Sequence, residues 1–363
     1  MAVNSHLQKL ISALMVRIGC SWLGGPWLGY HPAIRKLISA LGLIALALFA
    51  ACSPPSPPLT SKGVVRLPRD PKPPTAIDLL SLDPRNHLLY VAHSSSNSLD
   101  MIDTRTMKVV GSVAGLLNVK ATTPTSDPNI IFSSNGNDGT LSVIDVPARK
   151  VLEKIKIGGN PDAISYDPSH DVVAVGVTAE KKLKLVDVRT RKITASIELP
   201  GTPEQMAVDS QDGTIFVAIN DKDEVAVIDV GTQQVTKFYR SCNIKLPKGV
   251  AFDPESKRLF VADSPPSPVP GTLSIVDVLL DRCLGSVDLG KGTDQLGFNS
   301  HTHHVYTADG GSSFVSIVDS ISLKPLGVAG TGAGGGTLAV DSTTDMVYVG
   351  LEKRGLIAVY HDP

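Results

Sequence analysis

The chain has 363 residues with 34 basic and 35 acidic side chains, so its formal net charge at pH 7 is −1. Residues 1–52 hold four of the basic residues and no acidic one, which leaves 30 against 35 and a net charge of −5 in residues 53–363. Nucleic-acid binders carry a basic surface because phosphate neutralisation dominates their affinity. This charge balance argues against nucleic acid as a partner. We expect a monomer that binds a protein or a small polar ligand.

The N-terminal stretch has the layout of a signal peptide. Arg35 and Lys36 precede an apolar run over residues 37–51, and this run is short for a membrane span, which needs about 20 residues. It ends in Leu48-Phe49-Ala50-Ala51-Cys52, which resembles the bacterial lipobox, although Phe49 stands where that motif prefers a small aliphatic residue.

The resemblance implies a signal peptide over residues 1–52, a lipid on Cys52, and export to the periplasm on a membrane anchor. Ordinary signal cleavage nearby, with Cys52 incidental, stays open as an alternative. Residues 53–61 are rich in Pro and Ser and predict an extended linker between the anchor and the following domain.

A short apolar motif ending in aspartate recurs along the rest of the chain. Its copies end at Asp103, Asp145, Asp187, Asp229, Asp277 and Asp319, in steps of 42, 42, 42, 48 and 42 residues. A period of about forty residues predicts a repeat architecture. A degenerate copy, Ala358-Val359-Tyr360, adds a seventh unit.

Each unit predicts four short strands. In the third unit these are residues 163–166, 172–177, 182–186 and 193–197, rich in β-branched residues and separated by Asp, Pro, Gly and Ser. Four strands per 40–45 residues make one blade of a β-propeller. The prediction is an all-β, seven-bladed propeller over residues 62–363 with four-stranded antiparallel blades. The last unit lacks a fourth strand, and residues 63–67 are expected to complete blade 7 and remove its open edge.

Several copies share a further pattern, Tyr90-Val91-Ala92-His93 and Phe260-Val261-Ala262-Asp263 among them. With the turn Gly159-Asn160-Pro161, this resembles the YVTN-type β-propeller repeat of bacterial secreted proteins. The wider structural group includes lactonases, quinoprotein and nitrite-reductase-type propellers, surface-layer proteins and binding modules. The resemblance therefore implies a fold and leaves the function open.

Turn residues at the end of each first strand provide a register for the seven units: Asp83, Asp127, Asp167, Asp209, Asp253, Asn299 and Asp341. Aspartate at such turns accepts backbone hydrogen bonds, so we assign these residues to the fold. Five residues earlier lie what we call the mouth positions: Asp78, Thr122, Asp162, Glu204, Lys248, Asp294 and Gly336. Seven-fold geometry predicts that they surround one opening of the axial channel.

The acidic mouth positions suggest two kinds of chemistry. Carboxylate oxygens bind Ca²⁺ or Mg²⁺, which makes Asp162, Glu204 and Asp294 candidate metal ligands, and they also suit a hydroxyl-rich ligand. Converging carboxylates raise one another's pKa and produce an acid or base. The alternative is a solvated rim in which Lys248 pairs with a neighbouring carboxylate.

A second set of candidates lies ten residues after the turn register, where the second strand ends. His93, Asp263 and Asp309 occupy these positions in blades 1, 5 and 6, and we expect them to share a pocket with Asp78, Lys248 and Asp294. The alternative for His93 is a loop histidine that bonds a backbone carbonyl.

Other signals are weaker. The G-x-G-x-x-G match at residues 330–335 lies between two predicted strands, so NAD is not expected. A haem-attachment motif is missing from the sequence, and both tryptophans precede Cys52, which argues against a quinone cofactor such as PQQ. The histidines of residues 301–304 fall in a hairpin on the opposite face, where only adventitious metal binding is expected.

Cys242 and Cys283 are predicted to be free thiols. The register places them near opposite ends of a strand, roughly 20 Å apart, whereas a disulfide needs Cα atoms within about 7 Å.

Three functions are compatible with these features. The first is a non-enzymatic binding or scaffold module. The second is a lactonase-like hydrolase or lyase that uses the carboxylates at the axial channel, with or without a divalent cation. The third is an accessory subunit of a periplasmic redox enzyme. Whether the protein is an enzyme stays open.

Overall fold

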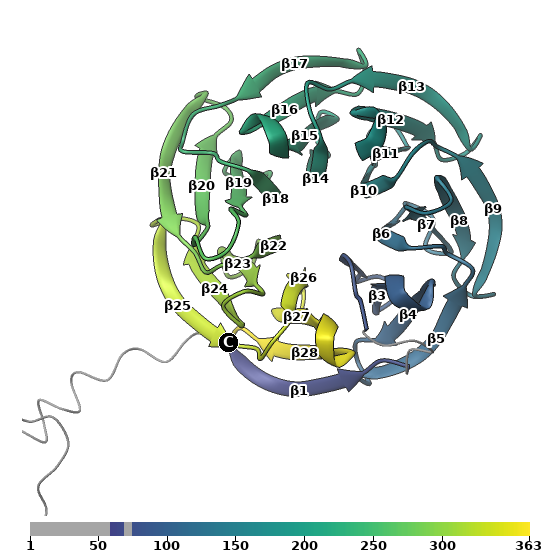
Figure 1. Ribbon diagram of the computed structural model, residues 1–363, viewed down its shortest axis with the longest axis horizontal. Coiled ribbons are helices and arrows are strands. Elements are labelled where there is room, and N and C mark those ends of the chain that lie inside the picture. Colours follow the sequence, from purple (N-terminus) through teal and green to yellow (C-terminus); the bar gives the residue numbers. More distant parts are fainter. Residues whose placement is uncertain (1–58, 69–74) are drawn as a thin grey trace, which may run out of the picture. The chain divides into compact units, whose positions relative to one another are not determined.

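The computed structural model describes residues 59–68 and 75–363. The predicted signal peptide, Cys52 and most of the predicted linker lie outside these residues. Within them, seven four-stranded antiparallel sheets stand around a central axis, which confirms the predicted seven-bladed β-propeller (Figure 1). Among these residues, no helix is long and apolar enough to cross a membrane.

Each blade runs from an inner strand beside the axis to an outer strand on the rim. Blades 1 and 2 consist of β2 (Leu80–Asp83), β3 (Leu88–His93), β4 (Ser98–Asp103) and β5 (Lys108–Ala114), then β6 (Val119–Pro124), β7 (Ile130–Asn135), β8 (Thr140–Asp145) and β9 (Lys150–Lys156). Blades 3 and 4 consist of β10 (Pro161–Asp167), β11 (Val172–Val177), β12 (Lys182–Asp187) and β13 (Lys192–Glu198), then β14 (Pro203–Asp209), β15 (Thr214–Ile219), β16 (Glu224–Asp229) and β17 (Gln234–Tyr239).

The remaining blades follow the same order. Blades 5 and 6 consist of β18 (Pro247–Asp253), β19 (Arg258–Asp263), β20 (Thr272–Asp277) and β21 (Arg282–Asp288), then β22 (Thr293–Asn299), β23 (His304–Asp309), β24 (Phe314–Asp319) and β25 (Lys324–Gly330). Blade 7 consists of β26 (Gly335–Asp341), β27 (Met346–Leu351), β28 (Leu356–His361) and β1 (Thr60–Arg66).

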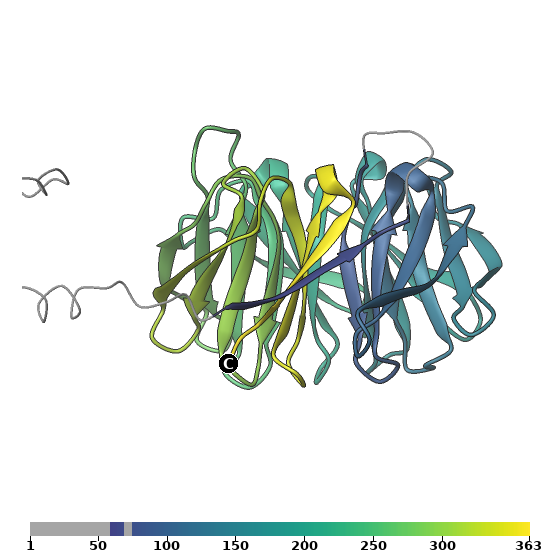
Figure 2. The ribbon, with the colours of Figure 1, turned by 90° about the horizontal axis from the view of Figure 1, so that it is seen from below.

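The N-terminal strand closes the ring, as predicted. β1 pairs antiparallel with β28 over Thr60–Arg66, so it begins three residues and ends one residue before the predicted 63–67. Figure 2 shows β1 crossing the outside of blade 7. Val65 faces inward with 5% of its surface exposed, whereas Val64 points outward with 61% exposed. The first and last strands of the propeller therefore share one sheet.

The core lies between the blades. Seven clusters of buried apolar side chains each join two neighbouring blades, because the two faces of every sheet are covered by the adjacent sheets. Ring contacts such as Phe216 with Phe252, at 5.0 Å between centroids, join blades 4 and 5. The turn aspartates act as predicted: the side chain of Asp167 accepts a hydrogen bond from the amide of Ser169 at 2.9 Å.

The two faces of the ring differ. The connections between second and third strands, and those leading into the next blade, share what we call the loop face. Four of these connections contain a 3-10 turn: η1 (Ser94–Ser96), η2 (Thr178–Glu180), η3 (Asn220–Lys222) and η4 (Glu352–Arg354). The hairpins after the first and third strands share the opposite, turn face. The C-terminus lies at the turn face (Figure 2).

The prediction of free thiols is wrong, because Cys242 and Cys283 form a disulfide with their Cα atoms 5.0 Å apart. The connection between β17 and β18 covers residues 240–246, longer than the 199–202 connection one blade earlier. Instead of staying on the loop face, it packs beside β20 and β21. Ser274 donates a hydrogen bond to the carbonyl of Cys242 at 2.6 Å, and Cys242 is buried between blades 4 and 5. This places Cys242 at the level of Cys283.

Candidate functional site

Strand pairing identifies the equivalent mouth positions directly. In blades 3 to 7 the first residue of the inner strand pairs with the last residue of the second strand, as Pro161 pairs with Val177, and the mouth position follows it. In blade 2 the corresponding pair is Val119 with Asn135, so the mouth residue is Lys120. The prediction of Thr122 is wrong by two residues. It is counted back from Asp127, which lies two residues further along its hairpin than the turn residues of the other blades.

The mouth positions surround a cavity of about 220 Å³ at the axis. The predicted residues Asp78, Asp162, Glu204, Lys248 and Asp294 all line it, together with Lys120. Figure 1 looks down the axis, and the labelled inner strands β6, β10, β14, β18 and β22, which contain five of these residues, surround the centre of the ring. The sequence register therefore located residues that line one cavity, with four acidic and two basic side chains.

Two ion pairs use part of this charge. Lys120 Nζ lies 2.9 Å from Asp78 Oδ2, and Lys248 Nζ lies 3.0 Å from Asp294 Oδ1. The carboxylates of Asp162 and Glu204, from the adjacent blades 3 and 4, make no hydrogen bond or ion pair with any residue that the structure describes. The cavity thus presents two adjacent carboxylates that are open to a ligand.

Burial changes the acidity of these groups. It raises the pKa of Asp78 to about 7, against the opposing charge of Lys120. It also raises the pKa of Glu204 to about 7, opposed by Lys248 and assisted by repulsion from Asp162. Burial also raises the pKa of Asp162. Lowered solvation disfavours the carboxylate form. A cation bound beside these groups would therefore stabilise their ionised form strongly.

Two glutamines lie just inside the mouth. Gln205 in blade 4 donates a hydrogen bond from Nε2 to the carbonyl of Asp294 in blade 6, at 2.7 Å. Gln295 in blade 6 donates to the carbonyl of Leu80 at 3.1 Å and accepts from the amide of Leu338 at 3.0 Å. These side chains connect four blades across the axis, and Gln205 forms part of the cavity lining with Leu79 and Ala163.

The second predicted set does not line this cavity. His93, Asp263 and Asp309 have at most 2% of their surface exposed and lie inside their own blades. His93 Nδ1 is 2.7 Å from Asp100 Oδ2, and Thr272 donates to Asp263 at 2.6 Å. In blades 1, 5 and 6 the side chain of this residue makes hydrogen bonds to side chains of the same blade, which hold the blade together. The expected pocket that joins these three residues with the mouth is wrong.

Asp309 shows this structural role most completely. Its Oδ1 accepts hydrogen bonds from the hydroxyls of Thr293 at 2.5 Å and Thr307 at 3.1 Å. Its Oδ2 accepts from the hydroxyl of Ser316 at 2.5 Å and the amide of Gly290 at 3.1 Å. Four donors thus converge on one buried carboxyl group.

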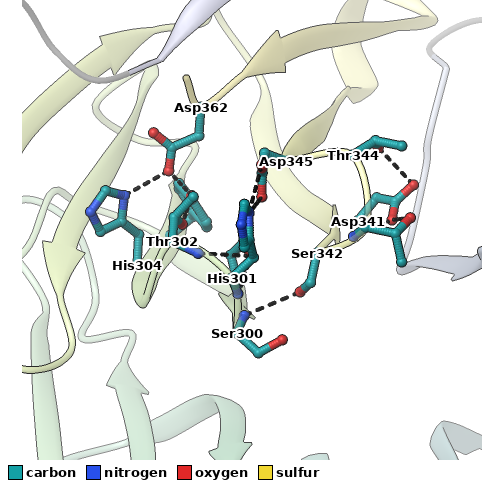
Figure 3. Close-up of polar contacts among 12 residues, drawn as sticks. Ser300, His301, Thr302, His304, Asp341, Ser342, Thr344, Asp345 and Asp362 are labelled. Atoms are coloured by element: carbon teal, nitrogen blue, oxygen red, sulfur yellow. Dashed lines mark hydrogen bonds and ion pairs between the residues drawn. The ribbon is translucent and has the colours of Figure 1, made fainter.

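The hairpin that carries the histidines of residues 301–304 lies on the turn face, as predicted, and His301 and His304 contact carboxylates (Figure 3). His301 Nδ1 is 2.9 Å from Asp345 Oδ2, and His304 Nδ1 is 2.6 Å from Asp362 Oδ2, which also accepts a hydrogen bond from Tyr306. These contacts join blades 6 and 7. Over residues 59–68 and 75–363, no three His, Cys, Asp or Glu side chains form a group that could hold a metal ion.

The sequence reasoning missed Lys120, Gln205 and Gln295. The aspartates that end the third strands would have found Lys120, because Asp145 and Asp187 are 42 residues apart, as are Lys120 and Asp162. The glutamines directly follow the mouth positions Glu204 and Asp294, and a polar residue on an innermost strand is the signal that marks them.

No protein-family model matches the chain, and no curated protein sequence matches it either. The structure is similar to a solved structure of Kuenenia stuttgartiensis hydrazine synthase, with a TM-score of 0.70 and 16% identity. The match covers 78% of this chain and 95% of that chain. In all, 1609 solved chains match, so the fold is too widespread to indicate a function. These comparisons show a shared fold, which agrees with the seven-bladed β-propeller.

Proposed function

We propose that this chain is an exported, lipid-anchored propeller of the YVTN type that binds a small organic cation at the axial mouth. The observation that carries this proposal is the pair of adjacent carboxylates, Asp162 and Glu204, which line the cavity without an ion-pair partner among the described residues. A primary amine supplies the positive charge and the hydrogen-bond donors that such carboxylates accept.

The test is calorimetric titration with ethanolamine and, separately, with Ca²⁺ and Mg²⁺. Ethanolamine should bind, and its affinity should rise between pH 6 and pH 8, because Glu204 has a pKa of about 7 and binds a cation in its ionised form. Glu204→Gln should weaken binding about tenfold, the effect of roughly 1.4 kcal/mol expected for one charge-assisted contact.

Glu198→Gln is the matched control, since Glu198 is an exposed glutamate paired with Lys182 and does not line the cavity. It should leave the affinity unchanged. If ethanolamine fails to bind in the millimolar range, the amine proposal is wrong. Binding of Ca²⁺ or Mg²⁺ that is lost in Glu204→Gln would instead support the divalent-cation site.

A second candidate is a hydrolase or lyase of lactonase type. The observation that favours it is the pKa of about 7 for both Asp78 and Glu204, the range in which a carboxyl group serves as a general acid or base at neutral pH. Lactone hydrolysis measured with the wild type, Asp78→Asn and Glu204→Gln tests it. Activity that is equal in all three proteins would exclude these groups from catalysis. The likeness to hydrazine synthase concerns the fold and supports no redox role.

A further inference from the structure

A second cavity adjoins the axial mouth on the loop face. It has a volume of about 300 Å³ and lies among blades 5, 6 and 7. Lys248 and Asp294 line both cavities, so the two spaces share one wall. Glu352 and Lys353, from η4, also line the second cavity.

Gly336 opens the ring toward this second cavity. It is the mouth position of blade 7, where the other six blades carry a charged side chain. A Cβ built at Gly336 would meet no atom closer than 4.0 Å, namely Asp294 Cβ, and its φ lies outside the left-handed region. Neither backbone conformation nor packing therefore requires glycine here. By contrast, a Cβ at the neighbouring Gly311 would lie 2.9 Å from the carbonyl oxygen of Lys291.

The end of the second cavity away from the mouth is lined, like the mouth, by acidic and basic side chains. The side chain of Glu352 makes no hydrogen bond or ion pair within the described ranges, and burial raises its pKa, opposed by Lys353. Five carboxylates line the two cavities, Asp78, Asp162, Glu204, Asp294 and Glu352, against three lysines, Lys120, Lys248 and Lys353, which leaves two negative charges when all are ionised. Between the two ends the lining is mainly glycine backbone and Ile77.

We propose that the two cavities form one elongated site for a linear organic cation with at least two amino groups joined by an alkyl chain. One amino group lies at Asp162 and Glu204, the other lies at Glu352, and the alkyl chain passes over Gly336. This inference rests on the proposed function, because it uses the same carboxylates at the mouth. Beyond the proposed function, it specifies that the ligand is elongated and carries a second positive charge.

Calorimetric titration of the full chain with spermidine and with ethanolamine tests the proposal. Spermidine should bind at least tenfold more tightly than ethanolamine to the wild type. Glu352→Gln should remove most of this advantage and leave ethanolamine affinity unchanged. Gly336→Leu should also remove most of this advantage, by closing the passage, and Gly330→Leu is the matched control. Gly330 ends β25, and a Cβ there meets nothing within 4 Å.

The outcomes separate this inference from the proposed function. Equal affinities for spermidine and ethanolamine in the wild type would overturn the elongated site and leave the amine-binding mouth in place. An equal loss of affinity for both ligands in Glu352→Gln would also overturn the elongated site. If neither amine binds, both proposals are overturned. Glu352 is partly exposed on a surface turn, so Glu352→Gln should fold normally. The test therefore stays decisive even if Gly336→Leu fails to fold.

Discussion

At the scale of single residues, similar carboxyl groups have different roles according to where a strand directs them. Asp294 and Asp309 both belong to blade 6 and lie at the same end of the β22–β23 pair, where Thr293 pairs with Asp309. Asp294 lines the axial cavity and pairs with Lys248. Asp309 is fully buried and accepts hydrogen bonds from four donors. The first faces the axial cavity, and the second stabilises the blade.

We predict that Asp309→Asn destabilises the protein by about 2–4 kcal/mol and leaves amine affinity unchanged. The amide nitrogen of asparagine cannot accept hydrogen bonds, so two of the four buried donors lose their partner. Chemical denaturation and calorimetric titration of the same variant check both parts. Normal stability combined with lost amine affinity would show that Asp309 belongs to the binding site.

The mouth positions could be predicted because the repeat places them at a constant distance from a turn residue. This succeeded for Asp78, Asp162, Glu204, Lys248 and Asp294, which all line the cavity. It failed in blade 2, where Thr125 occupies the turn position, Asp127 lies two residues further on, and Lys120 takes the place given to Thr122. The prediction placed His93 correctly at the end of its strand. It was wrong about the side chain, which points into the blade and not toward the mouth. A constant spacing identifies a level along the axis and does not determine which way a side chain points.

At the scale of structural elements, the connection between β17 and β18 departs from the repeat. Residues 240–246 have no counterpart of equal length in blade 3, and the repeat therefore could not indicate their path. They pack into the space between blades 4 and 5, where Cys242 reaches Cys283. The disulfide links two neighbouring blades in addition to the apolar core between them.

We predict that Cys283→Ser lowers the free energy of unfolding by about 3 kcal/mol. The disulfide closes a segment with a sequence separation of 41 residues, which restricts the unfolded chain. Thermal unfolding with and without dithiothreitol checks this, because only the wild type should become less stable on reduction. A variant as stable as the oxidised wild type would show that the disulfide contributes nothing.

The closing strand β1 provides a second prediction with an internal control. Val65→Asp should destabilise the protein by about 3 kcal/mol or more, because it places an unpaired carboxylate in the core between blades 7 and 1. Val64→Asp, one residue away but 61% exposed, should have little effect. Urea denaturation of both variants measures the difference. Equal loss in the two variants would contradict the inward direction of Val65.

At the scale of the whole molecule, buried and exposed acids make opposite contributions to the pH dependence of stability. The pKa values of Asp78 and Glu204 are raised to about 7, so the folded protein holds protons that the unfolded chain has already lost above pH 4 to 5. Their contribution to stability is present at low pH and is lost as pH rises toward 7. Hydrogen bonds lower the pKa of Asp103 to about 2, so its contribution is lost as pH falls below 4.

We therefore predict a stability maximum near pH 4–5 and a decrease on the order of 2 kcal/mol between pH 5 and pH 7. Glu204→Gln should reduce this decrease, because the amide does not ionise. Denaturant unfolding at each pH measures it. A Glu204→Gln profile parallel to that of the wild type over this range would show that the mouth acids titrate normally. Asp103→Asn should affect stability mainly above pH 4.

The two glutamines at the mouth determine how a bound molecule exchanges with solvent. Gln205 and Gln295 cross the axis by hydrogen bonds between blades 4 and 6 and between blade 6 and blades 7 and 1. We expect these hydrogen bonds to narrow the channel below the mouth, so that a ligand arrives and departs by the opening on the loop face. A partner seated on the loop face would trap the occupant and slow its release. A partner on the turn face would leave exchange unaffected.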